Sequence, residues 1–196
     1  FFNKDGEWES EITLIQKDKV EVKFIKKIKQ ANNSSKIELA ICLVKKTPME
    51  TILQKSTELG VSKIIPIVSE RTEVKNLNYE RARKIVIEAT EQSNQLVPPE
   101  ISKVTKLKDF LKIRDVNTKL LFADINSKES LKKNDLKDYK SICLLIGPEG
   151  DFSPLERESI LKNMSIKPFT MSKNILRSET AVISAISLVN FLLINP

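Results

Sequence analysis

Two short loops in the last third of the sequence carry most of the residues that could do chemistry. The first, residues 147–150 (Gly-Pro-Glu-Gly), follows the apolar run 142–146 and precedes a helix start at 153–156. A strand that ends in a tight turn before a helix places that turn at the carboxyl edge of a sheet, where α/β proteins bind ligands. A phosphate-binding loop would need more glycines and a following Lys, and Glu149 would repel a phosphate. The loop therefore predicts a site for an uncharged or cationic ligand.

The second loop, residues 172–181, joins the last apolar strand to a strongly apolar helix. It places Arg177, Glu179 and Thr180 together at the start of that helix. The first backbone N–H groups of a helix have no partner within it, so they also point toward such a loop. We expect the two loops to form one site.

Several kinds of chemistry are excluded by composition. The chain has no histidine, which excludes Ser-His-Asp and Cys-His catalysis and removes the commonest metal ligand. The two cysteines, Cys42 and Cys143, are too few for a zinc site, and we predict no bound metal. Both cysteines lie inside apolar runs, which indicates small core residues in a reducing compartment and a cytoplasmic protein.

The charge balance leaves two interpretations open. The net charge is +7 with an isoelectric point near 9.3. A polyanionic partner such as nucleic acid would account for this excess, and so would a lysine-rich surface with no specific partner. No apolar run approaches the roughly 18 residues of a membrane span, so we expect no membrane association.

The first 30 residues have a different pattern from the rest. Apolar residues alternate with polar ones at Ile12 and Leu14 and again at Val20, Val22 and Phe24, which predicts half-buried antiparallel strands. The small polar residues 31–35 predict a linker. We therefore expect a boundary between a β-structured segment, residues 1–32, and a second domain, residues 36–196.

From residue 36 onward, strands and helices alternate. Continuous apolar runs predict strands that are covered on both faces, and capping residues mark the helix starts. The alternation predicts an α/β fold with a mostly parallel sheet and helices on both faces. The expected strands are 37–44, 64–68, 120–123, 142–146 and 166–171, and the expected helices are 78–92, 153–163 and one that begins at a capping box, 47–50, and ends at Gly60.

The last helix, about 179–193, has almost no polar face. A helix that is apolar all round must be buried all round. We expect a homodimer through this helix, and a central helix within a monomer is the alternative.

The two loops together resemble those of a known family. Residues 145–153 (Leu-Ile-Gly-Pro-Glu-Gly-Asp-Phe-Ser) and 175–181 (Ile-Leu-Arg-Ser-Glu-Thr-Ala) are similar to the SPOUT superfamily of methyltransferases. Within it they resemble the bacterial ribosomal RNA small-subunit methyltransferase E family. Residues 69–72 and 91–93 also match, and residues 1–12 are similar to the end of that family's N-terminal PUA-like β-barrel.

This resemblance implies a fold, a cofactor and a substrate. The fold would be a trefoil-knotted α/β domain at residues 36–196, preceded by the remainder of the PUA-like RNA-binding barrel. The cofactor would be S-adenosylmethionine, and the reaction would methylate N3 of a uridine in 16S rRNA of the small ribosomal subunit. The cofactor-binding residues carried over from the resemblance are Phe122, Ala123, Leu145, Ile146, Gly147, Glu149, Gly150, Met171, Ile175, Leu176, Arg177 and Thr180.

Three charged residues in the matched segments are candidate catalytic groups. Uridine N3 must lose a proton, and Glu91 and Glu179 are the carboxylates available to take it. Arg177 could stabilise the oxygen that becomes negative as N3 loses its proton, or hold an RNA phosphate. A helix cap or a surface ion pair is the alternative role for each of the three.

The sequence departs from the family pattern at three places. Asp151 stands where a third glycine is common, Ser172-Lys173 where Gly-Pro is common, and Gln95 where an arginine is common. Two other functions stay open: a SPOUT relative that methylates ribose 2′-OH or tRNA, and a non-catalytic RNA-binding protein of ribosome assembly.

Overall fold

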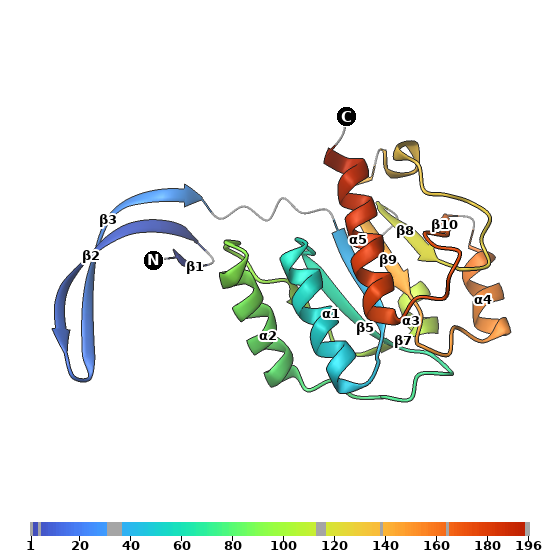
Figure 1. The fold of residues 1–196 in the computed structure, drawn as a ribbon, viewed down its shortest axis with the longest axis horizontal. Coiled ribbons are helices and arrows are strands. Elements are labelled where there is room, and N and C mark those ends of the chain that lie inside the picture. Colours follow the sequence, from blue (N-terminus) through green and yellow to red (C-terminus); the bar gives the residue numbers. More distant parts are fainter. Residues whose placement is uncertain are drawn as a thin grey trace.

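The computed structural model describes residues 2–3, 5–30, 37–112, 117–137, 139–163 and 165–194 (Figure 1). The predicted linker, 31–35, lies outside the described residues. Three antiparallel strands come first, β1 (Phe2–Asn3), β2 (Gly6–Gln16) and β3 (Lys19–Gln30). The antiparallel strands expected before residue 30 are therefore present.

The burial expected for these strands is wrong. Ile12 is 58% exposed and Phe24 51%, and every residue of β3 is exposed. The alternating pattern indicated one buried face, but no second layer covers that face among the described residues. Contacts within the hairpin are local, such as the packing of Trp8 against Phe24 with ring centroids 5.9 Å apart.

A parallel sheet forms the centre of the rest of the chain. Its strands run in the order β10-β8-β9-β4-β5-β6, and β7 also pairs with β5. Every pairing in this sheet is parallel, which confirms the predicted α/β class. The strands are β4 (Ile37–Cys42), β5 (Lys63–Val68), β6 (Glu100–Ile101), β7 (Thr105–Lys106), β8 (Thr118–Ala123), β9 (Ser141–Ile146) and β10 (Ile166–Phe169).

Helices cover both faces of this sheet (Figure 1). On one face α1 (Lys46–Glu58) packs against α2 (Tyr79–Gln92) and α5 (Ser178–Ile194). On the other lie α3 (Leu107–Lys112) and α4 (Pro154–Leu161). Each face of the sheet has its own hydrophobic core: the first lies under α1, α2 and α5, and the second lies under α3 and α4. Successive strand residues point to opposite faces, so Leu39 joins the first core and Ala40 the second.

Two of the predicted helix starts are confirmed and one is wrong. The Asn78 side chain accepts a hydrogen bond from the Arg81 N–H at 3.0 Å, and Ser153 and Glu156 form a capping box. The expected box at 47–50 does not form, because α1 begins earlier, after Lys45, and has no side-chain cap. Gly60 ends α1 with φ of +81°, as predicted.

Several short elements lie outside the predicted pattern. β6, β7, α3 and the 3-10 helix η1 (Lys133–Leu136) are all shorter than seven residues. A strand of two residues, or a helix of fewer than two turns, is too short for its hydrophobic periodicity to show, whereas the longer predicted strands are continuous apolar runs. None of the described helices is long and apolar enough to cross a bilayer.

The cysteines occupy the second core, as expected. Cys42 and Cys143 are both buried, and neither is in a disulfide. They lie on neighbouring strands, but Cys143 is in register with Glu38 rather than Cys42. A bridge between them would therefore need a shift of the strands.

Candidate functional site

The carboxyl ends of three neighbouring strands surround a cavity of about 300 Å³. β8, β9 and β10 lie within one side of the sheet, and the segments that follow them line this cavity, which we call the switch cavity. Ser178 and Ala181 close it from the start of α5. Ligands of open α/β sheets bind at such positions, outside the carboxyl ends of strands.

The charged side chains that line the switch cavity are all acidic. Asp124, Glu149 and Asp151 are among the lining residues, and no Lys or Arg is, among the residues that the structure describes. Acidic side chains repel a phosphate and attract a cation. Apolar side chains such as Ile146 and Leu176 and several backbone segments complete the lining. This set of groups fits S-adenosylmethionine, which carries a sulfonium cation and a flat aromatic base that backbone groups and apolar side chains can bind.

The 147–151 loop is closed by a tight turn. The Asp151 N–H donates to the Pro148 carbonyl at 2.9 Å, and Asp151 adopts a φ of +57°. Aspartate tolerates this left-handed conformation because its short side chain can bond locally. Here Asp151 Oδ1 accepts from the Phe152 N–H at 2.7 Å. Asp151 thus adopts the backbone conformation that a glycine would otherwise supply.

The opposite wall is shaped by hydrogen bonds within residues 170–174. Thr170 Oγ1 donates to the Ser172 carbonyl at 3.1 Å, and the Asn174 N–H donates to Ser172 Oγ at 3.0 Å. Ile175 follows and is 88% exposed at the cavity mouth. An apolar side chain so exposed is available to a partner or substrate.

An ion pair lies beneath the cavity. Asp124 at the end of β8 is 4% exposed, and its Oδ2 accepts from Arg157 Nη2 of α4 at 2.7 Å. Its Oδ1 accepts from the Asn126 N–H at 2.9 Å. The hydrogen bond with Asp124 raises the pKa of Arg157 above its already high ordinary value, so this guanidinium stays charged. The pair fixes one wall of the cavity to α4.

Comparison with known proteins identifies the family. Residues 30–190 match the RNA methyltransferase domain family. A Rickettsia conorii protein named ribosomal RNA small subunit methyltransferase E is 34% identical over 195 residues, which cover 98% of this chain and 79% of the relative. An Aquifex aeolicus protein of the same name is 38% identical over 153 residues, 73% of this chain and 63% of the relative.

The chain belongs to the ribosomal RNA small subunit methyltransferase E family.

Solved structures agree with this assignment. A Neisseria gonorrhoeae ribosomal RNA small subunit methyltransferase E bound to S-adenosyl methionine superposes with a TM-score of 0.85 at 28% identity, covering 97% of this chain and 81% of that one. A Legionella pneumophila structure with the bound cofactor SAM has a TM-score of 0.79 at 31% identity over the same shares. The predicted S-adenosylmethionine-dependent rRNA methyltransferase is thereby confirmed at the level of the family.

In this family member, most of the predicted cofactor residues line the switch cavity. They come from both motif loops and from the end of β8. The eight are Ala123, Ile146, Gly147, Glu149, Gly150, Met171, Ile175 and Leu176.

Four predicted cofactor residues do not line it. Phe122 and Leu145 are fully buried in the second core, where Phe122 packs edge-on against Phe152 with centroids 5.7 Å apart. They precede Ala123 and Ile146 in their strands, and the alternation of strand side chains turns them away from the cavity. Arg177 and Thr180 are exposed beside it.

The predicted catalytic residues are not all brought together. Arg177 and Glu179 lie at the start of α5, next to the lining residue Ser178. Glu91 lies in the last turn of α2, is exposed, and does not line the cavity. Its role stays a prediction.

Asp124, Pro148 and Thr170 line the cavity although none of them was among the predicted cofactor-binding residues. Asp124 and Thr170 directly follow β8 and β10, so polar residues at strand carboxyl ends would have been a usable signal. Pro148 lies within the motif itself. Nothing in the sequence indicated that Arg157 pairs with Asp124, because the two residues are 33 positions apart in the chain.

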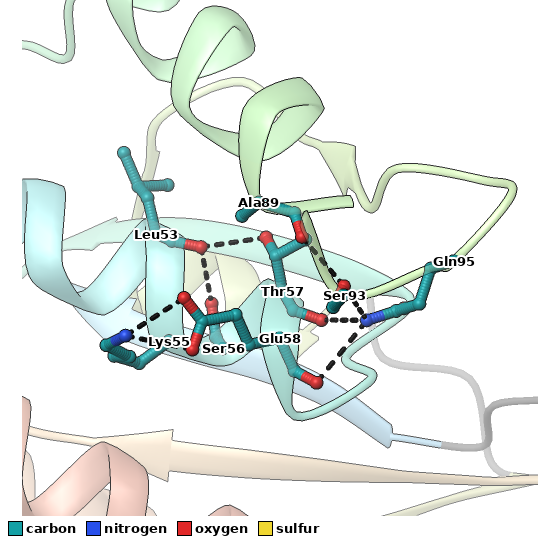
Figure 2. Close-up of polar contacts among 8 residues, drawn as sticks. All are labelled: Leu53, Lys55, Ser56, Thr57, Glu58, Ala89, Ser93 and Gln95. Atoms are coloured by element: carbon teal, nitrogen blue, oxygen red, sulfur yellow. Dashed lines mark hydrogen bonds and ion pairs between the residues drawn. The ribbon is translucent and has the colours of Figure 1, made fainter. Parts of the chain in front are cut away.

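Gln95 has a structural role in this chain (Figure 2). Its Nε2 donates to the carbonyl of Thr57 at 2.6 Å and to Ser93 Oγ at 2.9 Å. The last carbonyls of a helix have no partner within it. Gln95 therefore caps α1 from the segment that follows α2.

Proposed function

We propose that this chain transfers the methyl group of S-adenosylmethionine to N3 of a uridine in 16S rRNA of the small ribosomal subunit. The observation that carries this proposal is the acidic and backbone-rich switch cavity. Both family motifs line it, at the strand ends where an α/β sheet binds its ligand. The solved Neisseria gonorrhoeae relative, bound to S-adenosyl methionine, supports the same cofactor here.

The 147–150 loop and the 170–176 wall would hold the cofactor between them. Bound there, S-adenosylmethionine supplies an electrophilic methyl group. The N–H groups of Glu149 and Gly150 have no hydrogen-bond partner among the described residues, so both are available to a ligand. Leu176 and Ile146 supply apolar contacts.

The chain must also take the proton from uridine N3. Glu179 is half-buried and adjacent to Ser178, which lines the cavity, so it is the stronger candidate base within one chain. Glu91 could act only if the bound RNA or a second chain brings it to the site.

Arg177 would stabilise the charge that N3 deprotonation sends to the uracil oxygens. Its side chain is exposed and makes no ion pair or hydrogen bond among the described residues. It is therefore free to turn toward a bound uridine or an RNA phosphate.

We also infer a homodimer through α5. Phe191 is 64% exposed and Ile194 74% exposed at the end of this helix. Large apolar side chains left in water favour association, and a two-fold axis would bury both copies of the same face. The knotted topology, the PUA-like character of the first 32 residues and the domain boundary at 36 belong to this proposal through the family resemblance.

Calorimetric titration with S-adenosylmethionine tests the cofactor site. We expect saturable binding by the wild-type dimer, and weaker binding by Ala181→Leu because the larger side chain intrudes on the cavity. Gln54→Leu, exposed on α1 outside the cavity, is the matched control. Absence of binding, or equal binding by both variants, would contradict the site.

Nucleoside analysis of methylated 16S rRNA tests the reaction. We expect 3-methyluridine. A 2′-O-methylated nucleoside, or methylation of tRNA alone, would point to a different SPOUT activity. Salt-dependent RNA binding without cofactor binding would point to an assembly protein.

A further inference from the structure

A turn from another part of the chain contacts the 147–151 loop from outside the switch cavity. Residues 69–72 (Ser-Glu-Arg-Thr) follow β5, and we call them the β5 turn. It contacts both the 147–151 loop and the start of α4, more than 75 residues later in the chain. None of its residues lines the switch cavity.

The β5 turn is internally fixed. The Ser69 N–H donates to Thr72 Oγ1 at 2.9 Å, the two hydroxyl oxygens lie 2.8 Å apart, and the Thr72 N–H donates to the Ser69 carbonyl at 3.3 Å. Both side chains are at most 5% exposed. The same two side chains lie beside the buried Cys42 thiol. The turn therefore holds the residues between Ser69 and Thr72 in a defined position.

One of those residues is joined to the start of α4. The carboxylate of Glu156 accepts from the Glu70 N–H at 2.9 Å through one oxygen and from the Ser153 N–H at 3.1 Å through the other. The second of these bonds is half of the α4 capping box. Glu156 therefore joins the β5 turn to the start of α4, the helix that follows the 147–151 loop.

The side chain of Arg71 extends from the β5 turn to the 147–151 loop. Its Nη1 donates to the Gly150 carbonyl at 2.9 Å. On the other side of the same peptide group, the Asp151 N–H donates to the Pro148 carbonyl at 2.9 Å. The peptide group between Gly150 and Asp151 is thus held at both its oxygen and its nitrogen, and it cannot rotate without losing both bonds.

We propose that Arg71 is a positioning residue that pre-forms the 147–151 loop for the cofactor. The proposal rests on the proposed function, because it takes the switch cavity as the S-adenosylmethionine site. A ligand held by backbone groups loses less free energy when those groups are ordered before it binds. Arg71 orders this loop from outside, so its removal should weaken cofactor binding without removing any contact to the cofactor.

The test uses three variants of the whole chain and calorimetric titration with S-adenosylmethionine. Arg71→Met keeps an unbranched apolar side chain and removes the donor to the Gly150 carbonyl, and we expect the Kd to rise about tenfold. Arg71→Lys keeps a cationic donor and should recover part of that loss. Arg83→Met removes an exposed arginine of α2, outside the switch cavity, and should leave the Kd unchanged.

Turnover and RNA binding separate positioning from other roles. With saturating cofactor, we expect the turnover of Arg71→Met to return to within about twofold of wild type, because the defect lies in ordering the site. The thermal midpoint should stay close to that of Arg83→Met. A Kd for S-adenosylmethionine within twofold of wild type would overturn the proposal.

An unchanged cofactor Kd with weaker binding of 16S rRNA would instead make Arg71 a phosphate contact. A thermal midpoint far below that of Arg83→Met, with no rescue by lysine, would make it a general stabilising residue. Both results overturn the proposal. Failure of the proposed function is distinguishable, because there the wild-type protein would itself fail to bind S-adenosylmethionine.

Discussion

Asp124 and Arg157 form an ion pair in which one partner is buried and the other is not. The Asp124 side chain is 2% exposed and the Arg157 side chain 34%. Removing the arginine leaves a carboxylate in the protein interior, whereas removing the carboxylate leaves a guanidinium that water can reach. The two substitutions should therefore differ in cost.

We expect Arg157→Met to lower the free energy of unfolding by about 2 kcal/mol, because a buried charge loses its partner. Asp124→Asn should cost about 1 kcal/mol, because Arg157 can be hydrated. Urea unfolding at pH 7 measures both, and the double variant should cost less than the sum. Equal losses from the two single variants would show that Asp124 is solvated once Arg157 is removed.

The two glycines of the motif should respond differently to alanine. A Cβ on Gly147 would lie 3.1 Å from Phe152 Cε2, closer than ordinary contact, whereas one on Gly150 would meet Arg71 atoms at 3.8 and 3.9 Å. Neither glycine has a positive φ. We expect Gly147→Ala to cost about 1–3 kcal/mol through crowding and Gly150→Ala to change stability by less than about 0.5 kcal/mol.

Urea unfolding of both glycine variants checks this, and Gly150→Ala is the matched control. Greater destabilisation by Gly150→Ala would contradict the packing argument. Packing within the protein therefore excludes a side chain at Gly147 and leaves room for one at Gly150.

The cap that Gln95 provides on α1 can be tested with a third pair of variants (Figure 2). Gln95→Ala removes the donor to the Thr57 carbonyl and should cost about 1 kcal/mol. Gln95→Arg keeps a donor and adds a cation at the carboxyl end of α1, which favours positive charge by about 0.5 kcal/mol. It should therefore be at least as stable as wild type.

Urea midpoints compare these variants with Gln92→Ala, whose side chain is exposed nearby on α2. Cofactor affinity should be unchanged in all three. Loss of cofactor affinity in Gln95→Ala with normal stability would give Gln95 a functional role instead.

Much of the site could be predicted from the sequence because its two loops follow strands with clear patterns. Residues 142–146 are apolar without interruption, so the strand before Gly147 was visible, and Ser153 to Glu156 marked the helix after it. A loop between that strand and that helix must lie at the carboxyl edge of the sheet, where the cavity is. The same reasoning could not separate Ala123 from Phe122, because a strand buried on both faces shows no alternation.

The contacts that support the site could not be predicted. The β5 turn bonds to Gly150 and Glu156 across 79 and 86 residues, and nothing local in either segment indicates its partner. The early start of α1 was missed for a different reason. Thr47 to Glu50 has the form of a capping box, but α1 begins after Lys45 and uses no side-chain cap.

Cys42 predicts a dependence of stability on alkaline pH. Burial raises the pKa of its thiol from 9.0 to about 12. In the unfolded chain the thiol ionises near its ordinary value, while in the folded chain it stays protonated. The contribution of the protonated Cys42 thiol to the free energy of unfolding is therefore complete below about pH 9. It declines as the pH rises toward 12, by at most about 1.4 kcal/mol per pH unit.

Urea unfolding between pH 8 and 10.5 measures this decline. In Cys42→Ala the free energy of unfolding should fall less steeply with pH, because only the other titratable groups then contribute. Iodoacetamide at pH 8 provides a second measurement. Cys42 should react in urea and stay unmodified in the native protein. Rapid native alkylation would show that the thiol is accessible.

Arg177 gives the prediction closest to the chemistry. If it stabilises the uracil oxygen as N3 loses its proton, Arg177→Ala should lower turnover on 16S rRNA about 100-fold at saturating S-adenosylmethionine. Arg177→Lys keeps the charge and should retain part of the activity, and Arg83→Ala is the control for lost surface charge. Its side chain is exposed and makes no hydrogen bond or ion pair among the described residues, so the loss should come without loss of stability. Normal turnover by Arg177→Ala would remove it from the mechanism and leave Glu179 as the group at the start of α5 to test next.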